Sequence, residues 1–119
     1  MTINEYQQLA QRTSATTDSM DKFTNGCLGA AGEAGECAEI CKKVKYHGHQ
    51  LDRVAFVEEI GDLLWYCAEM AASIGVDLDT IAAANLQKLY HRYPERFDSE
   101  LSIHRDKDAD TEAVREAMQ

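Results

Sequence analysis

The sequence has one proline, no long apolar run and little positive charge. Pro94 is the only residue that is excluded from a helix interior, so the chain before it can form long helices. Apolar runs are only a few residues long, so no transmembrane helix is expected. Lysine and arginine together number 12 against 21 acidic residues, which gives a formal net charge of −9. A chain this acidic repels a phosphate backbone, which argues against nucleic-acid binding through charge.

The first residues and the cysteines also lack patterns that would place the protein outside the cytoplasm. The segment MTINEYQQLAQR carries an early acid and has no apolar block before a cleavage site, so no signal peptide is expected. Cys37 and Cys41 share a helical face, as in a metal clip, but no CxxC spacing is present. Small buried thiols in a reducing compartment explain Cys27, Cys37, Cys41 and Cys67 better. We therefore expect a cytoplasmic protein without a membrane partner.

Apolar residues recur at helical spacing, and neither strand-like alternation nor an internal repeat is present. With 119 residues, of which 45% are hydrophobic, the chain is long enough for one domain with one core. The spacing predicts helices over residues 2–12, 23–46, 52–73 and 77–92. The fold class is therefore all-α, with a four-helix-bundle-like core. We assign residues 1–97 to one domain and residues 98–119 to a polar, mobile tail with a short helix from Thr111.

The second and third helices carry features that predict close packing. Gly26, Gly29, Gly32 and Gly35 recur every three residues, and each costs about 1 kcal/mol of helix propensity relative to alanine. Close approach of another helix, or a kink, would offset that cost. The apolar residues expected on the inner sides of these helices include Leu28, Cys41 and Val44, and then Val57, Ile60 and Leu64.

Four acids on these helices lack the basic neighbours that surface acids usually have. Glu39 is ordinary, because Lys42 and Lys43 follow it at helical spacing. No lysine or arginine lies three or four residues from the pairs Glu33/Glu36 and Glu59/Asp62. The two members of each pair lie about 4.5 Å apart along a helix axis, so like charges face each other. A solvated acidic face would explain one such pair, but two pairs on consecutive helices favour a bound cation.

Carboxylates alone select hard cations, so the expected metal is Mg²⁺ or Mn²⁺ and not Zn²⁺. Asn85, Lys88 and Arg92 form a polar stripe on the fourth helix, which fits either a phosphate clamp or a solvated helix end. Trp65 follows the acids by one turn and could stack on a nucleobase, although core packing is the commoner role of a tryptophan.

Three blocks follow one another in order within residues 1–97: GEAGE at residues 32–36, EEIGDLLWY at 58–66 and NLQKLYHRYP at 85–94. Together they resemble the MazG-type branch of the all-α nucleoside triphosphate pyrophosphohydrolases. The family signature is ExxE followed, after a dozen to somewhat under thirty residues, by ExxD. Here 22 residues separate Glu36 from Glu59. Either short motif alone carries little information, whereas the three ordered blocks are specific.

The resemblance implies a four-helix core that completes its active site in a homodimer or a tetramer of dimers. It implies a nucleoside triphosphate as substrate, cleaved between the α and β phosphates to a monophosphate and pyrophosphate, with Mg²⁺ as cofactor and Mn²⁺ as a substitute. The implied metal ligands and catalytic residues are Glu33, Glu36, Glu59 and Asp62, and one of these glutamates would also orient the attacking water. The implied phosphate or sugar contacts are Asn85, Lys88 and Arg92, with Lys43 as a further candidate.

The leading hypothesis is therefore a pyrophosphohydrolase that removes unwanted or surplus nucleotides from the pool. An enzyme selective for dUTP or dCTP, or a phosphoribosyl-ATP pyrophosphohydrolase of related fold, would use the same chemistry. A non-catalytic helical regulator would bind a nucleotide or a protein without releasing pyrophosphate. A purely structural oligomer would leave the unpartnered acids unexplained.

Overall fold

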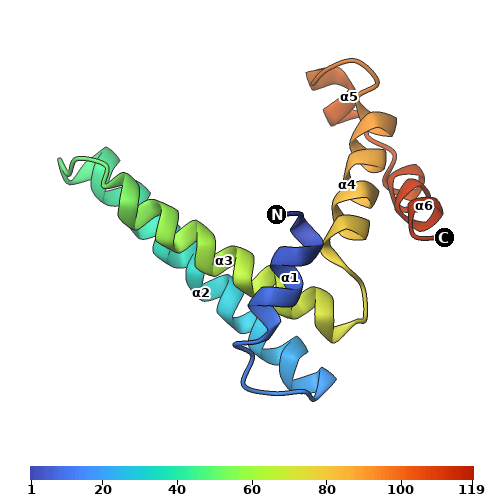
Figure 1. Ribbon diagram of the computed structural model, residues 1–119. Coiled ribbons are helices and arrows are strands. Elements are labelled where there is room, and N and C mark those ends of the chain that lie inside the picture. Colours follow the sequence, from blue (N-terminus) through green and yellow to red (C-terminus); the bar gives the residue numbers. More distant parts are fainter. The chain divides into compact units, whose positions relative to one another are not determined.

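The computed structural model describes residues 1–119, and every regular element in it is a helix (Figure 1). This confirms the predicted all-α fold class. The chain divides into two compact units, residues 1–77 and residues 78–119. None of the helices combines the length and hydrophobicity that a membrane span requires. The first unit contains α1 (Ile3–Gln11), α2 (Ser19–Tyr46) and α3 (Arg53–Ser73); the second contains α4 (Leu78–Arg92), α5 (Ser99–Ile103) and α6 (Lys107–Ala117).

The first unit is an antiparallel hairpin of α2 and α3, with α1 packed against α3 (Figure 1). The Asp18 side chain caps α2, so this helix begins four residues before the predicted start at residue 23. Asp52 caps α3 by accepting hydrogen bonds from the amides of Val54 and Ala55. Gly48, with a φ of +73°, ends α2 at the turn between the two helices. These local signals give the two long helices their bounds.

Two of the four regularly spaced glycines allow α2 to approach α3 closely. A Cβ atom at Gly29 would lie 2.1 Å from the ring of Tyr66, and one at Gly26 would lie 2.6 Å from Cγ of Met70. The predicted close helix approach is therefore confirmed at these two positions. Gly32 and Gly35 have no such neighbour within 4 Å. The contacts at Gly26 and Gly29 fix the register of the α2–α3 hairpin.

Several residues that the sequence places in the interior are exposed in the single chain. Leu28 is 72% exposed and Val57 is 66% exposed, while Cys41, Val44, Ile60 and Leu64 are also exposed. The expectation of buried thiols is wrong for this chain, since Cys27 and Cys41 are exposed and Cys37 and Cys67 are only partly buried. The physical reason is that a two-helix hairpin covers one face of each helix and leaves the others open.

Residues 98–119 form ordered helices in the second unit, whereas the sequence predicts a mobile tail there. Asp98 caps α5, and Asp106 caps α6 by accepting hydrogen bonds from the amides of Asp108 and Ala109. Because of this cap, α6 begins at Lys107, four residues before the predicted start at Thr111. The α6 helix packs against α4, and Asp110 is 4% exposed within that contact. The cap residues Asp98 and Asp106 were the missed signals.

Gly29 should be intolerant of even a methyl group. Gly29→Ala forces the Tyr66 ring away from α2 and should lower the free energy of unfolding by about 1–3 kcal/mol, the usual cost of overpacking. Gly32→Ala is the matched control on the same helix, and it should raise stability by up to about 1 kcal/mol through helix propensity. Urea unfolding of both variants measures the difference. Equal stability of the two variants would contradict the proposed role of Gly29 in the helix contact.

Candidate functional site

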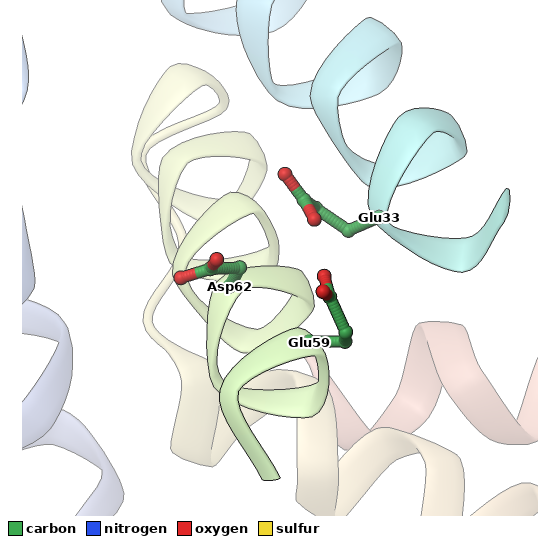
Figure 2. Close-up of side chains that lie close together, drawn as sticks. All are labelled: Glu33, Glu59 and Asp62. Atoms are coloured by element: carbon green, nitrogen blue, oxygen red, sulfur yellow. The ribbon is translucent and has the colours of Figure 1, made fainter. Parts of the chain in front are cut away.

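Three carboxylates from the two sequence motifs lie together between α2 and α3. Glu33 projects from α2, and Glu59 and Asp62 project from α3 (Figure 2). Each offers a carboxylate oxygen, and these oxygens all lie within 4.8 Å of one another. Glu33 and Glu59 are partly buried and Asp62 is exposed. We call these three residues the acidic cluster.

The acidic cluster already perturbs the titration of one of its members. The pKa of Glu59 is raised above its ordinary value, first by burial, next by a hydrogen bond with the Glu33 side chain, and then by the negative charges of Glu33, Glu36 and Asp62. No lysine or arginine forms an ion pair with the cluster; the lysines of this unit that form ion pairs do so with Glu39 and Glu69. The chain itself therefore leaves this negative charge without a counter-ion.

Glu36, the fourth predicted ligand, lies outside the acidic cluster. It is exposed on α2, one turn from Glu33, and its charge is close enough to contribute to the raised pKa of Glu59. Its carboxylate does not share the 4.8 Å spacing of the other three. The role of Glu36 as a ligand stays a prediction, and a side-chain rotation would be the way for it to join the cluster.

A cleft with a volume of about 330 Å³ adjoins the acidic cluster. It is lined by Glu33, Asp62, Trp65 and Tyr66, so the predicted residue Trp65 does lie beside the acids. Trp65 and Tyr66 meet edge to face, with ring centroids 5.1 Å apart and an interplanar angle of 85°. The cleft is thus lined by two carboxylates and two aromatic rings; we call Trp65 and Tyr66 its aromatic wall.

The helix α1 supports the aromatic wall. The indole N–H of Trp65 donates to the carbonyl oxygen of Ala10 at 3.2 Å and to Oγ1 of Thr13 at 2.8 Å. Tyr6 has a raised pKa, caused first by burial and then by the charges of Asp62 and Cys67, which places its phenol in the field of the cluster. No motif or spacing in the sequence indicates that the first helix borders the acids.

The residues predicted to contact phosphate or sugar are distant in sequence from the acids of the cluster. Lys43 is on α2, about 15 Å along the helix axis from Glu33, and it forms an ion pair with Glu39. Asn85, Lys88 and Arg92 lie on α4 in the second unit, where Asn85 is exposed and Lys88 is partly buried. Their assignment to phosphate or sugar contact stays a prediction.

Arg92 already has an anionic partner within its own unit. Its Nε and Nη2 atoms donate to Oδ2 of Asp110 at 3.1 and 2.5 Å, and Nε of Arg105 lies 3.5 Å from the same oxygen. The hydrogen bond from Arg92 is the main cause of the lowered pKa of Asp110. A phosphate that binds Arg92 would therefore share or replace this carboxylate.

Comparison with known proteins supports the family suggested by the motifs. The family model described as "MazG nucleotide pyrophosphohydrolase domain" matches residues 27–97, which include the acidic cluster, Trp65 and the polar stripe of α4. The chain belongs to this family. Searches of curated proteins and of solved structures gave no match. The MazG match ends at the residue where the sequence predicts the end of the domain and begins 26 residues after its predicted start.

The acidic cluster of this MazG domain is chemically suited to the metal that the family uses. Carboxylate oxygens are hard ligands and suit Mg²⁺ or Mn²⁺ better than soft-ligand metals. The cluster combines three such groups from two helices with uncompensated charge, so a divalent cation would relieve their repulsion. The residues present therefore fit a divalent metal ion.

Glu69 is a further acid that lacks basic neighbours at helical spacing, like the members of the acidic cluster. Glu69 has no lysine or arginine three or four residues away and lies in the apolar run from Ala68 to Ala72. In the structure its side chain is fully buried, but Lys22 and two polar side chains from distant sequence positions satisfy it. An unpartnered acid in a helix thus indicates either a metal ligand or a buried network.

The raised pKa of Glu59 predicts opposite pH trends without and with metal. Between the ordinary and the raised pKa, folded Glu59 holds a proton that the unfolded chain releases, so the metal-free protein should lose stability as the pH rises through this range. Mg²⁺ competes with that proton, so its stabilising effect should grow over the same range, up to about 2.7 kcal/mol at 100 times Kd. Thermal unfolding from about pH 4 to pH 7, with Mg²⁺ and with chelator, measures both trends.

Glu59→Gln provides the control for this titration. It should flatten the metal-free trend and weaken the Mg²⁺ effect at every pH. A Mg²⁺ effect that is independent of pH, or unchanged in Glu59→Gln, would show that the cluster does not bind the metal.

Proposed function

We propose that this protein is a divalent-metal-dependent nucleoside triphosphate pyrophosphohydrolase that releases a nucleoside monophosphate and pyrophosphate. The observation that carries the proposal is the meeting of Glu33, from the ExxE motif, with Glu59 and Asp62, from the ExxD motif, inside the segment that matches the MazG domain. Two acidic motifs separated in sequence form one cluster of ligand oxygens. A chance pair of surface acids would not produce this arrangement. The proposed role is removal of unwanted or surplus nucleotides.

The chemistry of the acidic cluster suits phosphoryl transfer. A divalent cation at these carboxylates would neutralise charge that develops on phosphoryl oxygens and would lower the pKa of a bound water. One of the glutamates of the two motifs would orient the attacking water and accept its proton. Glu36, one turn away on α2, would complete the ligand set or orient the water.

The cleft beside the cluster gives the nucleoside a binding position. Trp65 and Tyr66 form an aromatic wall next to Glu33 and Asp62, so a base or sugar in the cleft would lie beside phosphates at the acids. Lys43, Asn85, Lys88 and Arg92 would contact phosphate or sugar. The order of preference among bases follows from the shape of this cleft, and dUTP or dCTP selectivity is one possible outcome.

We further propose that the chain works as a homodimer or a tetramer of dimers. Leu28 on α2 and Val54 and Val57 on α3 are 72%, 71% and 66% exposed. Large apolar side chains on both helices of a hairpin are typical of a surface that another subunit covers. A second hairpin would supply two more helices and thereby form a four-helix core from two chains.

Analytical ultracentrifugation at micromolar concentration tests the assembly. The wild-type protein should sediment as a dimer or tetramer, and Val57→Glu should shift it toward monomer, because a buried charge without a partner costs several kcal/mol. Ile103→Glu, an exposed apolar residue of α5, is the matched control and should leave the assembly unchanged. A wild-type monomer at this concentration would contradict the oligomer proposal.

Turnover of a nucleotide panel tests the reaction. Pyrophosphate release from canonical and modified ribo- and deoxyribonucleotides should require Mg²⁺ or Mn²⁺ and should stop with chelator. Glu59→Gln and Asp62→Asn should lower kcat/KM by about 10²-fold or more, because each removes a charged ligand oxygen. Glu36→Gln should also lower it, if Glu36 joins the ligand set when metal binds.

Glu39→Gln is the control for this series, since Glu39 lies on α2 but pairs with Lys42 and Lys43 outside the cluster. It should keep near-wild-type turnover. If nucleotide binds but no metal supports pyrophosphate release, the regulator hypothesis replaces the enzyme. If Asp62→Asn turns over nucleotide at the wild-type rate, the site has been assigned to the wrong residues.

A further inference from the structure

The most deeply buried charged side chain of the first unit has no part in the proposed reaction. Glu69 on α3 is 0% exposed, whereas Glu33, Glu59 and Asp62 all keep contact with solvent. A buried carboxylate is costly unless hydrogen bonds and a counter-charge satisfy it. A leucine or methionine at this position would pack without that cost. The residues that bind the Glu69 carboxylate therefore indicate why a charge is present here.

All partners of Glu69 come from residues 10–22, which comprise the end of α1, the loop after it and the start of α2; we call this stretch the α1–α2 connection. Nε2 of Gln11 donates to Oε2 of Glu69 at 2.8 Å, and Oγ of Ser14 donates to Oε1 at 2.8 Å. Nζ of Lys22 lies 3.7 Å from Oε2 and also donates to Oε1 of Gln11 and to Oγ of Ser14. The carboxylate therefore binds the α1–α2 connection to α3 at three points.

The same stretch of chain also accepts hydrogen bonds from Trp65, which lies one turn before Glu69 on α3. The indole N–H of Trp65 donates to the carbonyl oxygen of Ala10 and to Oγ1 of Thr13. Ala10 directly precedes Gln11, and Thr13 directly precedes Ser14; Gln11 and Ser14 are both partners of Glu69. Positions 65 and 69 share one face of α3, so the connection contacts both residues at once.

We propose that Glu69 is a positioning residue, which holds the α1–α2 connection against α3 and thereby fixes Trp65 in the aromatic wall of the cleft. The inference rests on the proposed function, because it treats the cleft of Glu33, Asp62, Trp65 and Tyr66 as the place where the nucleoside binds. Glu69 touches neither the cleft nor the acidic cluster. It acts on nucleoside binding through the hydrogen-bond acceptors of the indole.

Glu69→Gln tests the proposal with little change in shape. The amide keeps one acceptor oxygen but turns an NH₂ group toward the donors of Gln11, Ser14 and Lys22, so the connection should detach. Because Trp65 is the only tryptophan of the chain, its fluorescence reports on the cleft directly. Acrylamide quenching of Trp65 should increase about twofold or more when the indole N–H loses its acceptors.

Kinetics separate positioning from general damage. In Glu69→Gln the KM for the nucleotide should rise about fivefold or more while kcat stays within about twofold, because the acidic cluster is held by α2 and α3 and not by the connection. The Kd for Mn²⁺ should stay unchanged for the same reason. Glu100→Gln is the matched control, since Glu100 is 76% exposed on α5, and it should match the wild-type protein in every measurement.

Thr13→Val keeps the test decisive if Glu69→Gln does not fold. It removes one acceptor of the indole N–H and leaves Glu69 and its partners in place, so it should raise acrylamide quenching and KM in the same direction but by less. If folded Glu69→Gln shows a lower Tm but unchanged quenching and KM, Glu69 is only structural and the proposal is overturned. Unchanged quenching and KM in Thr13→Val would overturn it equally.

The spectroscopic measurement distinguishes this inference from the proposed function. Acrylamide quenching needs no turnover, so it decides whether Glu69 positions Trp65 even if the wild-type protein releases no pyrophosphate from any nucleotide. Absent turnover with increased quenching in Glu69→Gln would reject the enzyme and keep the positioning role. Normal turnover of the wild-type protein with unchanged quenching in Glu69→Gln would keep the enzyme and reject the positioning role.

Discussion

The close approach of α2 and α3 at Gly26 and Gly29 is the constraint on which the candidate site depends. Each glycine leaves room for one large side chain of α3, Met70 at the first and Tyr66 at the second. One turn further along α2 from Gly29 is Glu33, and one turn back along α3 from Tyr66 is Asp62. The contact that fixes the register therefore also sets Glu33 opposite Asp62 and Glu59. A slip of the hairpin by one turn would separate the two acidic motifs.

The helices could be predicted from the sequence because their signals are local. Capping residues, the apolar period and Gly48 define α1 to α4 to within a few residues. The exposure of Leu28 and Val57 could not be predicted, since an apolar period says which face is to be covered and not which chain covers it. The last 22 residues were predicted as a tail because the caps Asp98 and Asp106 were overlooked and because the ion pair between Asp110 and Arg92 is a tertiary contact.

The candidate site was predictable in its residue types and less so in its geometry. Glu33, Asp62 and Trp65 line one cleft, and Glu59 joins the two acids in the cluster beside it. Glu36 lies nearby but outside the cluster, and Lys43 and Arg92 have acidic partners of their own. Sequence spacing within one helix cannot show such pairings when the partner lies on another helix, as it does for Arg92, Glu69 and Tyr6.

The buried acids that have a basic partner differ from the acidic cluster in how their negative charge is compensated. In a protein with a net charge of −9, cations are scarce, yet the partly buried Lys22 pairs with Glu69 and the partly buried Arg92 pairs with Asp110. These two carboxylates are the most deeply buried acids of their units, and both hold a helix or connection in place. The acidic cluster, although partly buried and mutually repulsive, receives neither lysine nor arginine. In the proposed function a cation from solution would compensate this charge, and through that cation the site would bind an anionic substrate.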